Sequence, residues 1–334
     1  MKYVSLGRTG VQVSPITLGC MNFGWGTEEA ESIDMIRHAV DSGINILDTA
    51  NVYGKGASEE IVGKAIKQLG IRNKIVLATK VHHKMHDSEP NSWGNHRYHI
   101  IQECENSLRR LQTDHIDLYQ VHRPEPSVPI DETLRALDSL VNSGKVRYVG
   151  TSTFAAWQLM ESLWASKEIG TCRFISEQPP YNLLDRRIER ELIPFAQTYG
   201  LAILPWSPLG GGLLSGKYRK GQERPAGSRY ETEGSAPMNR DHAGAFDRIE
   251  SVISIAEEFG LTPGVFSLSW VLNQIGITST IVGPKSMSQL RENLEALDVV
   301  WTSEMTDTVD HVIAPGSHVS NYYSANFGPN ARWM

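Results

Sequence analysis

The chain has 334 residues, of which 40% are hydrophobic, enough for one large domain or two small ones with a substantial core. Its formal net charge of −6 is spread over both signs with no basic block, which argues against nucleic acid or an anionic membrane as a partner and favours small-molecule chemistry. No apolar run approaches the roughly 20 residues of a membrane helix, and the start "MKYVSLGRTG" has no signal-peptide pattern, so we expect a cytoplasmic protein.

Apolar runs rich in β-branched residues recur along the chain and are predicted as buried strands. In chain order they span residues 13–19, 44–50, 74–80, 115–122, 146–152, 174–178, 201–207 and 279–283. Most are followed by a segment with helical periodicity, and examples are 28–43, 99–113, 130–144 and 185–200. Several of these segments end in glycine, where a left-handed C-cap is expected.

The alternation of strands and helices predicts the fold. Near-continuous hydrophobic strands between helices are typical of a parallel sheet covered on its outer face. For a chain of this length we predict one α/β domain over residues 1–334, a (β/α)8 TIM barrel. Residues 1–15 are expected as a β-hairpin that closes the barrel floor. Three long polar or Gly/Pro-interrupted stretches, 82–99, 216–246 and 311–334, are expected as functional loops at the C-terminal face.

This arrangement indicates four candidate catalytic side chains, because catalytic residues of such barrels gather at the carboxyl ends of the strands. Asp48, Lys80 and His122 end the second, third and fourth predicted strands, and Tyr53 lies in the loop after the second. An adjacent ammonium favours the phenolate form of a tyrosine. Lys80 could therefore make Tyr53 a usable proton donor, while Asp48 holds Lys80 and His122 binds a substrate oxygen.

Two other chemistries use some of the same side chains. Lys80 could be the Schiff-base nucleophile of an aldolase-like barrel. His82, His83 and His122 could ligate a metal together with Asp48, but consecutive histidines on an extended segment point in opposite directions, so we predict no metal site. The three cysteines are widely separated and form no CxxC pattern, which fits reduced thiols without an assigned role.

Four motifs, "DTANVYG", "LATK", "LYQVHRP" and "GTSTF", together resemble the aldo-keto reductases. The resemblance extends from "LGRTGVQVSPITLGCMNFG" to "IVGPKSMSQLRENLEAL", and it is closest to the branch of bacterial general reductases and β subunits of voltage-gated potassium channels. It implies a barrel without a Rossmann domain and a catalytic tetrad of Asp48, Tyr53, Lys80 and His122. The implied activity is NADPH-dependent reduction of aldehydes or ketones to alcohols, with Tyr53 as the general acid.

The resemblance also implies the cofactor contacts. Ser152 and Gln178 would hold the nicotinamide carboxamide, and Trp206 would stack under the ring. The other implied contacts are Gly19, Met21, Asp48, Ser207, Pro208, Leu209, Ser215, Lys217, Gly283, Lys285, Ser286, Gln289 and Asn293. Independently of the family, the turn at Gly283 joins a cation to a helix N-terminus, which favours an anion. Lys285 and Ser286, with no nearby acid dedicated to a ribose diol, favour NADPH over NADH.

The candidate substrate pocket is lined by aromatic side chains and by two tetrad members. They are Trp25, Tyr53, Trp93, His122, Tyr322, Tyr323 and Phe327. Two positions depart from the family pattern, because Asn51 stands where many relatives have Asp and Gln289 where some have Arg. The alternative function is an NADPH-binding regulatory subunit that resembles the channel β subunits and turns over poorly. The resemblance leaves both a monomer and a homo-oligomer open.

Overall fold

The computed structural model describes residues 1–86, 88–232 and 245–319, and its centre is one sheet of eight parallel strands. The strand order is β10-β3-β4-β5-β6-β7-β8-β9. The bounds are β3 Ile16–Gly19, β4 Ile46–Asp48, β5 Val76–Val81, β6 Ile116–Val121, β7 Val146–Ser152, β8 Phe174–Gln178, β9 Ala202–Ile203 and β10 Thr280–Val282. Each predicted run contains its strand except 74–80, which β5 exceeds by one residue at Val81. β9 is short because Pro205 has no N–H with which to extend the ladder.

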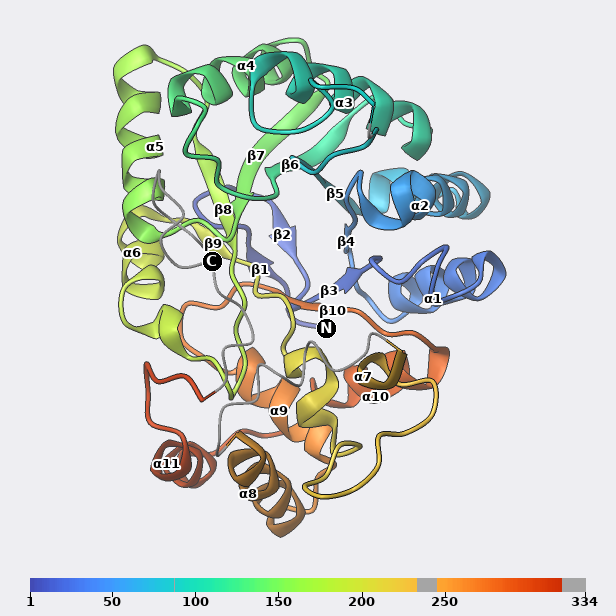
Figure 1. The fold of residues 1–334 in the computed structure, drawn as a ribbon, viewed down its shortest axis with the longest axis vertical. Coiled ribbons are helices and arrows are strands. Elements are labelled where there is room, and N and C mark those ends of the chain that lie inside the picture. The colour runs from blue at the N-terminus through green and yellow to red at the C-terminus, as the bar shows by residue number, and fades with distance from the viewer. Residues whose placement is uncertain (87, 233–244, 320–334) are drawn as a thin grey trace.

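The two edge strands of this sheet meet, which closes it. The Thr278 N–H donates to the Ile203 carbonyl at 2.9 Å, and the Ile281 N–H donates to the Pro205 carbonyl at 2.9 Å. These bonds join the segments around β9 and β10, so the sheet curls on itself with helices around it (Figure 1). The predicted (β/α)8 barrel is confirmed.

Helices surround the strands, and most of them bury their apolar faces against the outer side of the barrel (Figure 1). The α-helices are α1 Glu29–Asp41, α2 Ala57–Leu69, α3 Arg97–Leu111, α4 Ile130–Asn142, α5 Ala156–Ile169, α6 Leu192–Tyr199, α7 Arg229–Thr232, α8 Ala245–Glu258, α9 Pro263–Leu272, α10 Met287–Glu295 and α11 Ser303–Val312. The 3-10 helices are η1 Tyr53–Gly56, η2 Arg72–Lys74, η3 Arg187–Glu189 and η4 Gly210–Ser215. Among the helices in the described ranges, none has the length and apolar character needed to cross a membrane.

Two helix boundaries differ from the sequence prediction. The segment 185–200 begins with the 3-10 helix η3 and becomes α-helical only at Leu192, because Pro194 lacks an N–H and fits the first turn of a helix. The stretch 82–99 ends earlier than expected, since His96 caps α3 by accepting a hydrogen bond from the His99 N–H. The predicted glycine C-cap after the segment 185–200 is confirmed, with Gly200 at φ 71°.

The predicted N-terminal hairpin is confirmed as β1 Val4–Ser5 paired antiparallel with β2 Gln12–Val13. Its buried side chains Leu6 and Val13 pack against apolar residues of the barrel strands, such as Ile46 and Leu118. The hairpin therefore closes the end of the barrel at which the strands begin.

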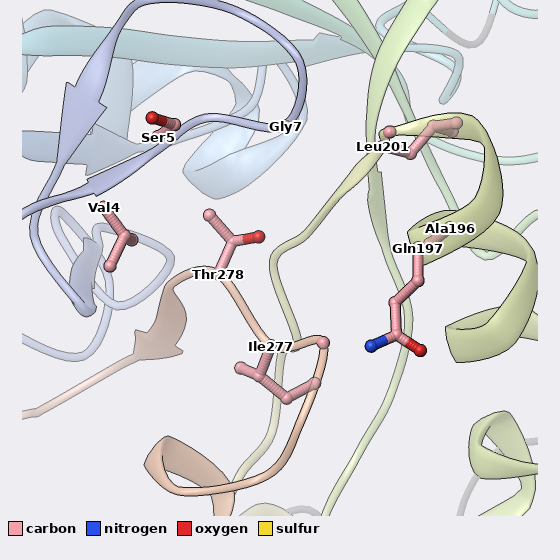
Figure 2. Close-up of a pocket in the computed structure, with 10 residues that line it drawn as sticks. Val4, Ser5, Gly7, Ala196, Gln197, Leu201, Ile277 and Thr278 are labelled. Atoms are coloured by element: carbon pink, nitrogen blue, oxygen red, sulfur yellow. The ribbon is translucent and has the colours of Figure 1, made fainter.

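A surface hollow of about 300 Å³ lies at this closed end (Figure 2). It is lined by Val4, Ser5, Gly7, Ala196, Gln197, Gly200, Leu201, Gly276, Ile277 and Thr278. None of these side chains titrates near neutral pH. Its lining residues 196–201 and 276–278 come directly before β9 and β10, at the amino ends of these strands. The hollow therefore lies away from the carboxyl ends of the strands and is not the candidate catalytic site.

Candidate active site

The sheet brings the four predicted catalytic residues to one end of the barrel. Asp48 is the last residue of β4, Lys80 lies next to the end of β5, and His122 follows β6 directly. Asp48, Lys80 and His122 are each at most 5% exposed. Tyr53 begins η1, the turn that leads from β4 into α2. The parallel register therefore places all four on neighbouring elements, as predicted.

The lysine is the centre of this group. Its Nζ donates to Asp48 Oδ1, to the Thr49 carbonyl at 2.8 Å and to the Tyr53 hydroxyl at 3.3 Å. The same Nζ lies 4.9 Å from the centroid of the Tyr53 ring. The His122 ring stands edge-on to the Tyr53 ring with 5.7 Å between centroids. A cation, a phenol and an imidazole thus share one mouth of the barrel.

Two glutamines hold the second oxygen of the Asp48 carboxylate. Gln178 Nε2 donates to Asp48 Oδ2 at 2.6 Å, and Gln120 Nε2 donates to the same oxygen at 3.1 Å. Gln120 was missed by the sequence prediction. It lies two residues before His122 on the same strand face, so the alternation of side chains along a strand could have identified it. The carboxylate is therefore fixed by β5, β6 and β8 together.

The electrostatics keep Lys80 charged. Burial alone lowers its pKa, but the charge of Asp48 and the interaction with Tyr53, through charge and hydrogen bonds, raise the pKa above its ordinary value. A Schiff-base nucleophile needs an unprotonated amine. The raised pKa therefore argues against the aldolase alternative.

His122 has the opposite character. Burial first, and then the charges of Lys80 and Arg123 and the nearby His83 and His82, lower its pKa well below the ordinary value. The ring is neutral at neutral pH and can donate one hydrogen bond. Its Nδ1 is buried and has no hydrogen-bond partner among the described residues. His122 is thus suited to bind a substrate oxygen, and it is not a source of charge.

The turn that carries Tyr53 has an unusual backbone. Gly54, Lys55 and Gly56 follow it with φ values of 57°, 53° and 103°. The left-handed region is costly for a lysine. A Cβ on Gly56 would lie 2.8 Å from Arg110 Cδ, so α3 presses against the turn and only glycine fits there. Packing against α3 therefore helps to set the position of Tyr53.

Buried polar groups behind this turn connect it to α2 and α3. Asn51 Nδ2 donates to Glu103 Oε2 at 3.0 Å. Arg110 forms ion pairs with Glu103 at 3.2 Å and with Glu59 at 2.6 Å. Thr79, beside Lys80, donates to the other oxygen of Glu59 at 2.5 Å. The departure at Asn51 thus has a partner in this chain, since the amide can donate to Glu103 where a carboxylate could not.

The ends of β7 and β8 are joined by a buried carboxyl group. Thr151 donates to Glu177 Oε2 at 2.5 Å, and the Phe154 N–H donates to Oε1 at 3.1 Å. Between them Thr153 has a left-handed φ of 61°. Burial raises the pKa of Glu177 to about 8, against the opposing effect of these hydrogen bonds. Glu177 therefore supports the Ser152 turn mainly as a neutral acid at pH 7.

The raised pKa predicts a pH-dependent stability for Glu177→Gln. The unfolded carboxyl ionises near its ordinary pKa of 4.5, whereas the folded one keeps its proton up to about pH 8. The wild type should therefore lose stability as pH rises from about 5 to 8, by on the order of a few kcal/mol. Glu177→Gln should match wild type at pH 5 and exceed it at pH 9 in denaturant unfolding. A difference that does not change with pH would contradict this, and the exposed Glu168→Gln is the control.

The loop after β9 contains the predicted contacts from Trp206 to Lys217. Ser207 has a left-handed φ of 58°, and its Oγ accepts from the Gly211 N–H at 3.0 Å. Gly210, Gly211 and Gly212 have φ values of 58°, 69° and 100°, so the "GGG" run is an ordered left-handed turn that requires glycine. In the same loop Pro208 is buried, Leu209 is half-buried, Ser215 Oγ donates to the Gly212 carbonyl at 2.7 Å, and Lys217 is exposed.

The segment after β10 lies against the loop after β3. Asn22 Nδ2 donates to the Gly283 carbonyl at 2.9 Å, and Thr27 donates to the Lys285 carbonyl at 3.0 Å. Gly19 ends β3, where a Cβ would lie 2.8 Å from Ile281 Cγ2. Predicted residues from both loops are therefore neighbours.

The N-terminus of α10 already has polar side chains around it. Ser286 caps the helix by accepting from the Gln289 N–H, and Gln289 Oε1 accepts from the Lys285 N–H at 2.8 Å. Glu31 Oε1 accepts from the Met287 N–H at 3.2 Å. The sequence prediction assumed no acid here, and the contact between residues 256 positions apart gave no local signal. Asn293 lies two turns further along α10, half-buried.

Of the predicted aromatic walls, two lie within the described residues. Trp25 is 54% exposed, donates to the Met21 carbonyl at 2.6 Å, and has Lys285 Nζ 5.7 Å from its ring centroid. Trp93 is 43% exposed and its ring lies 6.2 Å from that of His82. The other three, Tyr322, Tyr323 and Phe327, lie outside the described residues.

The metal alternative finds no ligand set in this part of the chain. Within the described ranges no group of three or more His, Cys, Asp or Glu side chains is arranged to hold a metal ion. His82 Nδ1 lies 3.0 Å from Asn95 Oδ1, which ties it to the loop.

Known proteins with similar sequences agree with the family resemblance of the sequence motifs. A family model described as "Aldo/keto reductase family" matches residues 15–314. The chain is 38% identical to an "Uncharacterized oxidoreductase YrpG" of Bacillus subtilis (strain 168), over 97% of this chain and 100% of the relative. It is 37% identical to "Aldo-keto reductase YhdN" of the same organism, over 93% and 92%. A "Putative voltage-gated potassium channel subunit beta" of Schizosaccharomyces pombe is 35% identical, over 92% of each chain.

Proposed function

The chain belongs to the aldo/keto reductase family, and we propose that it reduces aldehyde or ketone carbonyls to alcohols with NADPH, with Tyr53 as the general acid. The observation that carries this proposal is the contact of Lys80 Nζ with the Tyr53 hydroxyl at 3.3 Å, on a lysine that Asp48 holds. Burying an ammonium group beside a phenol costs desolvation free energy and adds little stability. The same contact stabilises the phenolate and so makes the tyrosine a better proton donor.

Several residues fit a nicotinamide dinucleotide. Gln178 donates through Nε2 to Asp48, which leaves its oxygen for the carboxamide, and Ser152 lies beside it at the end of β7. Lys285 forms no ion pair with any described residue and stands at the N-terminus of α10, where a phosphate is favoured. The ordered loop from Ser207 to Lys217 would follow the pyrophosphate. When bound, NADPH supplies the hydride for the carbonyl carbon.

The residues of the chain would handle the proton and the oxygen. Neutral His122 donates a hydrogen bond to the carbonyl oxygen and orients it. Tyr53 gives its proton to that oxygen as it becomes an alkoxide. Lys80 remains charged and stabilises the phenolate that is left, while Asp48, held by Gln120 and Gln178, keeps the ammonium in place.

The experiment that tests this function follows the oxidation of NADPH by absorbance against a panel of aromatic aldehydes, ketones, dicarbonyls and sugars. Binding of NADPH is measured separately by protein fluorescence. Turnover of at least one carbonyl class supports the proposal and ranks its substrates. A protein that does not bind NADPH would refute the assignment.

Cofactor preference gives a second prediction, at the N-terminus of α10. Lys285→Met should weaken NADPH binding by on the order of 10-fold and leave NADH unchanged, because a charged contact with the 2′-phosphate is lost. Glu31→Gln should act in the opposite direction and strengthen NADPH binding by roughly 2- to 5-fold, because a carboxylate near that site repels the phosphate. Dissociation constants for both cofactors check this. Equal changes for NADPH and NADH would place neither residue at the 2′-phosphate.

A second candidate function is a cofactor-binding regulatory subunit, because the similar protein of Schizosaccharomyces pombe is named as a putative channel β subunit. The structure adds an exposed apolar stripe on α5, with Trp157, Met160 and Trp164 exposed by 52%, 41% and 60%. Such a stripe is typical of a protein contact. Tight NADPH binding without turnover on the whole panel would favour this candidate.

A further inference from the structure

A second imidazole stands beside the one that the tetrad provides. The rings of His83 and His122 lie 4.7 Å apart between centroids and are nearly perpendicular, at 81°. The His122 ring in turn lies 5.7 Å from the Tyr53 ring. His83 therefore extends the row of polar side chains from Tyr53 through His122 by one more group at the same mouth of the barrel.

The preceding histidine has a different role. His82 Nδ1 lies 3.0 Å from Asn95 Oδ1, and its ring contacts Trp93 at 6.2 Å. The His82 and His83 rings lie edge-on with 5.2 Å between centroids, so the two side chains are in contact and the expectation that they point in opposite directions is wrong just beyond the end of β5. His82 is thus tied to the loop, and His83 is the one of the two that lies against His122.

His83 keeps its hydrogen-bonding capacity. Within the described part of the chain, no side chain or backbone group hydrogen-bonds to its ring, and the residue is only partly buried. Burial first, and then the nearby His82, Arg123 and Lys80, lower the pKa of His83 to about 4. At neutral pH the ring therefore offers one N–H donor and one lone pair, without a charge.

We propose that His83 determines substrate specificity by hydrogen-bonding a hydroxyl on the carbon next to the reacting carbonyl, so that the enzyme prefers 2-hydroxy aldehydes and ketones. This inference rests on the proposed function, because it needs His122 to hold the carbonyl oxygen. In such a substrate the two oxygens lie on adjacent carbons. When they lie on the same side, one can contact His122 and the other the neighbouring imidazole.

The charges around His83 agree with an oxygen at this place. The charged side chains that act on its ring, Arg123 and Lys80, are both positive. They favour an electron-rich group, and a neutral imidazole N–H can donate to it without the cost of burying another charge. A substrate without the hydroxyl would leave the imidazole unpaired, and sites that bind a substrate hydroxyl discriminate strongly on this basis.

The test compares glycolaldehyde with propanal, which differ by a hydroxyl in place of a methyl group. In His83→Phe, which keeps an aromatic ring without nitrogen, kcat/KM for glycolaldehyde should fall about 3- to 10-fold, as for loss of one hydrogen bond. The value for propanal should stay within about 2-fold. His83→Gln, which keeps a donor and an acceptor, should restore most of the glycolaldehyde activity, and His82→Phe should leave the ratio of the two substrates unchanged.

Two failures can be told apart. If wild type reduces both aldehydes and the ratio is the same in His83→Phe, the role of His83 is refuted and the proposed function stands. If wild type binds NADPH and reduces neither aldehyde nor any carbonyl of the wider panel, the proposed function fails and this inference fails with it.

Discussion

Tyr53→Phe is expected to lose turnover by about 10²- to 10⁴-fold while its affinity for NADPH stays within about 2-fold of wild type. The change removes one hydroxyl and keeps the ring that lies against His122 and Lys80. The hydroxyl is the only atom of this side chain that can give a proton to the developing alkoxide. Its loss should therefore lower kcat and leave the fold intact.

Steady-state kinetics and a fluorescence titration with NADPH measure the two quantities. Tyr3→Phe is the matched control, because that hydroxyl donates to the Gly43 carbonyl on the surface near the opposite end of the barrel. Retention of more than about a tenth of wild-type kcat in Tyr53→Phe would mean that another group, or water, supplies the proton.

Lys80→Met is expected to reduce both activity and stability. The variant removes the cation that hydrogen-bonds Tyr53, so kcat should fall by about 10²- to 10⁴-fold. It also leaves the buried Asp48 carboxylate without its ion pair, which typically costs about 3–5 kcal/mol. The two remaining bonds from Gln120 and Gln178 place the expected loss in the free energy of unfolding near the lower end, about 3 kcal/mol.

The double variant Asp48→Asn/Lys80→Met separates the two effects. Neutralising the carboxylate removes the unpaired charge, so stability in denaturant unfolding should recover by about 2 kcal/mol or more. Activity should not recover, because Tyr53 still lacks its cation. A double variant that remains as unstable as Lys80→Met would show that the unpaired carboxylate is not what destabilises the single variant. Recovery of activity would remove Lys80 from the chemistry.

The features that could be predicted are those with a local or periodic signal. Buried strands of a parallel barrel read as continuous apolar runs, so all eight were found, including β9, which Pro205 shortens. The catalytic candidates could be predicted because a strand that ends in a polar residue stands out after such a run. Asp48 stands opposite Ala78 in the register of β4 and β5, two residues before Lys80, and the structure places the Asp48 and Lys80 side chains in contact.

Contacts between distant segments could not be predicted. The hydrogen bonds of Asn51 to Glu103 and of Met287 to Glu31 join residues 52 and 256 positions apart. Each depends on which face of an outer helix meets which loop, and helix periodicity leaves that choice open. The pKa of Glu177 belongs to the same group, since it follows from burial between two strand ends.

Even within a correctly predicted segment, the roles of individual side chains could not be predicted from the sequence. His82 and His83 are identical residues in adjacent positions, and only the structure distinguishes them, because His83 lies against His122 while His82 contacts Asn95. The turn after Tyr53 has a lysine in the left-handed region between two glycines, and propensity alone would not place a lysine there.

Hydride transfer is tested most directly by following deuterium from the cofactor to the product. NADPH deuterated at C4 of the nicotinamide, on one face and then on the other, is incubated with the best carbonyl substrate of the panel, and the alcohol is examined by mass spectrometry and NMR. We predict that the alcohol carries the deuterium on its carbinol carbon from one of the two labelled cofactors and none from the other. An alcohol that takes this hydrogen from water, or NADPH consumption without any alcohol, would contradict hydride transfer at this site.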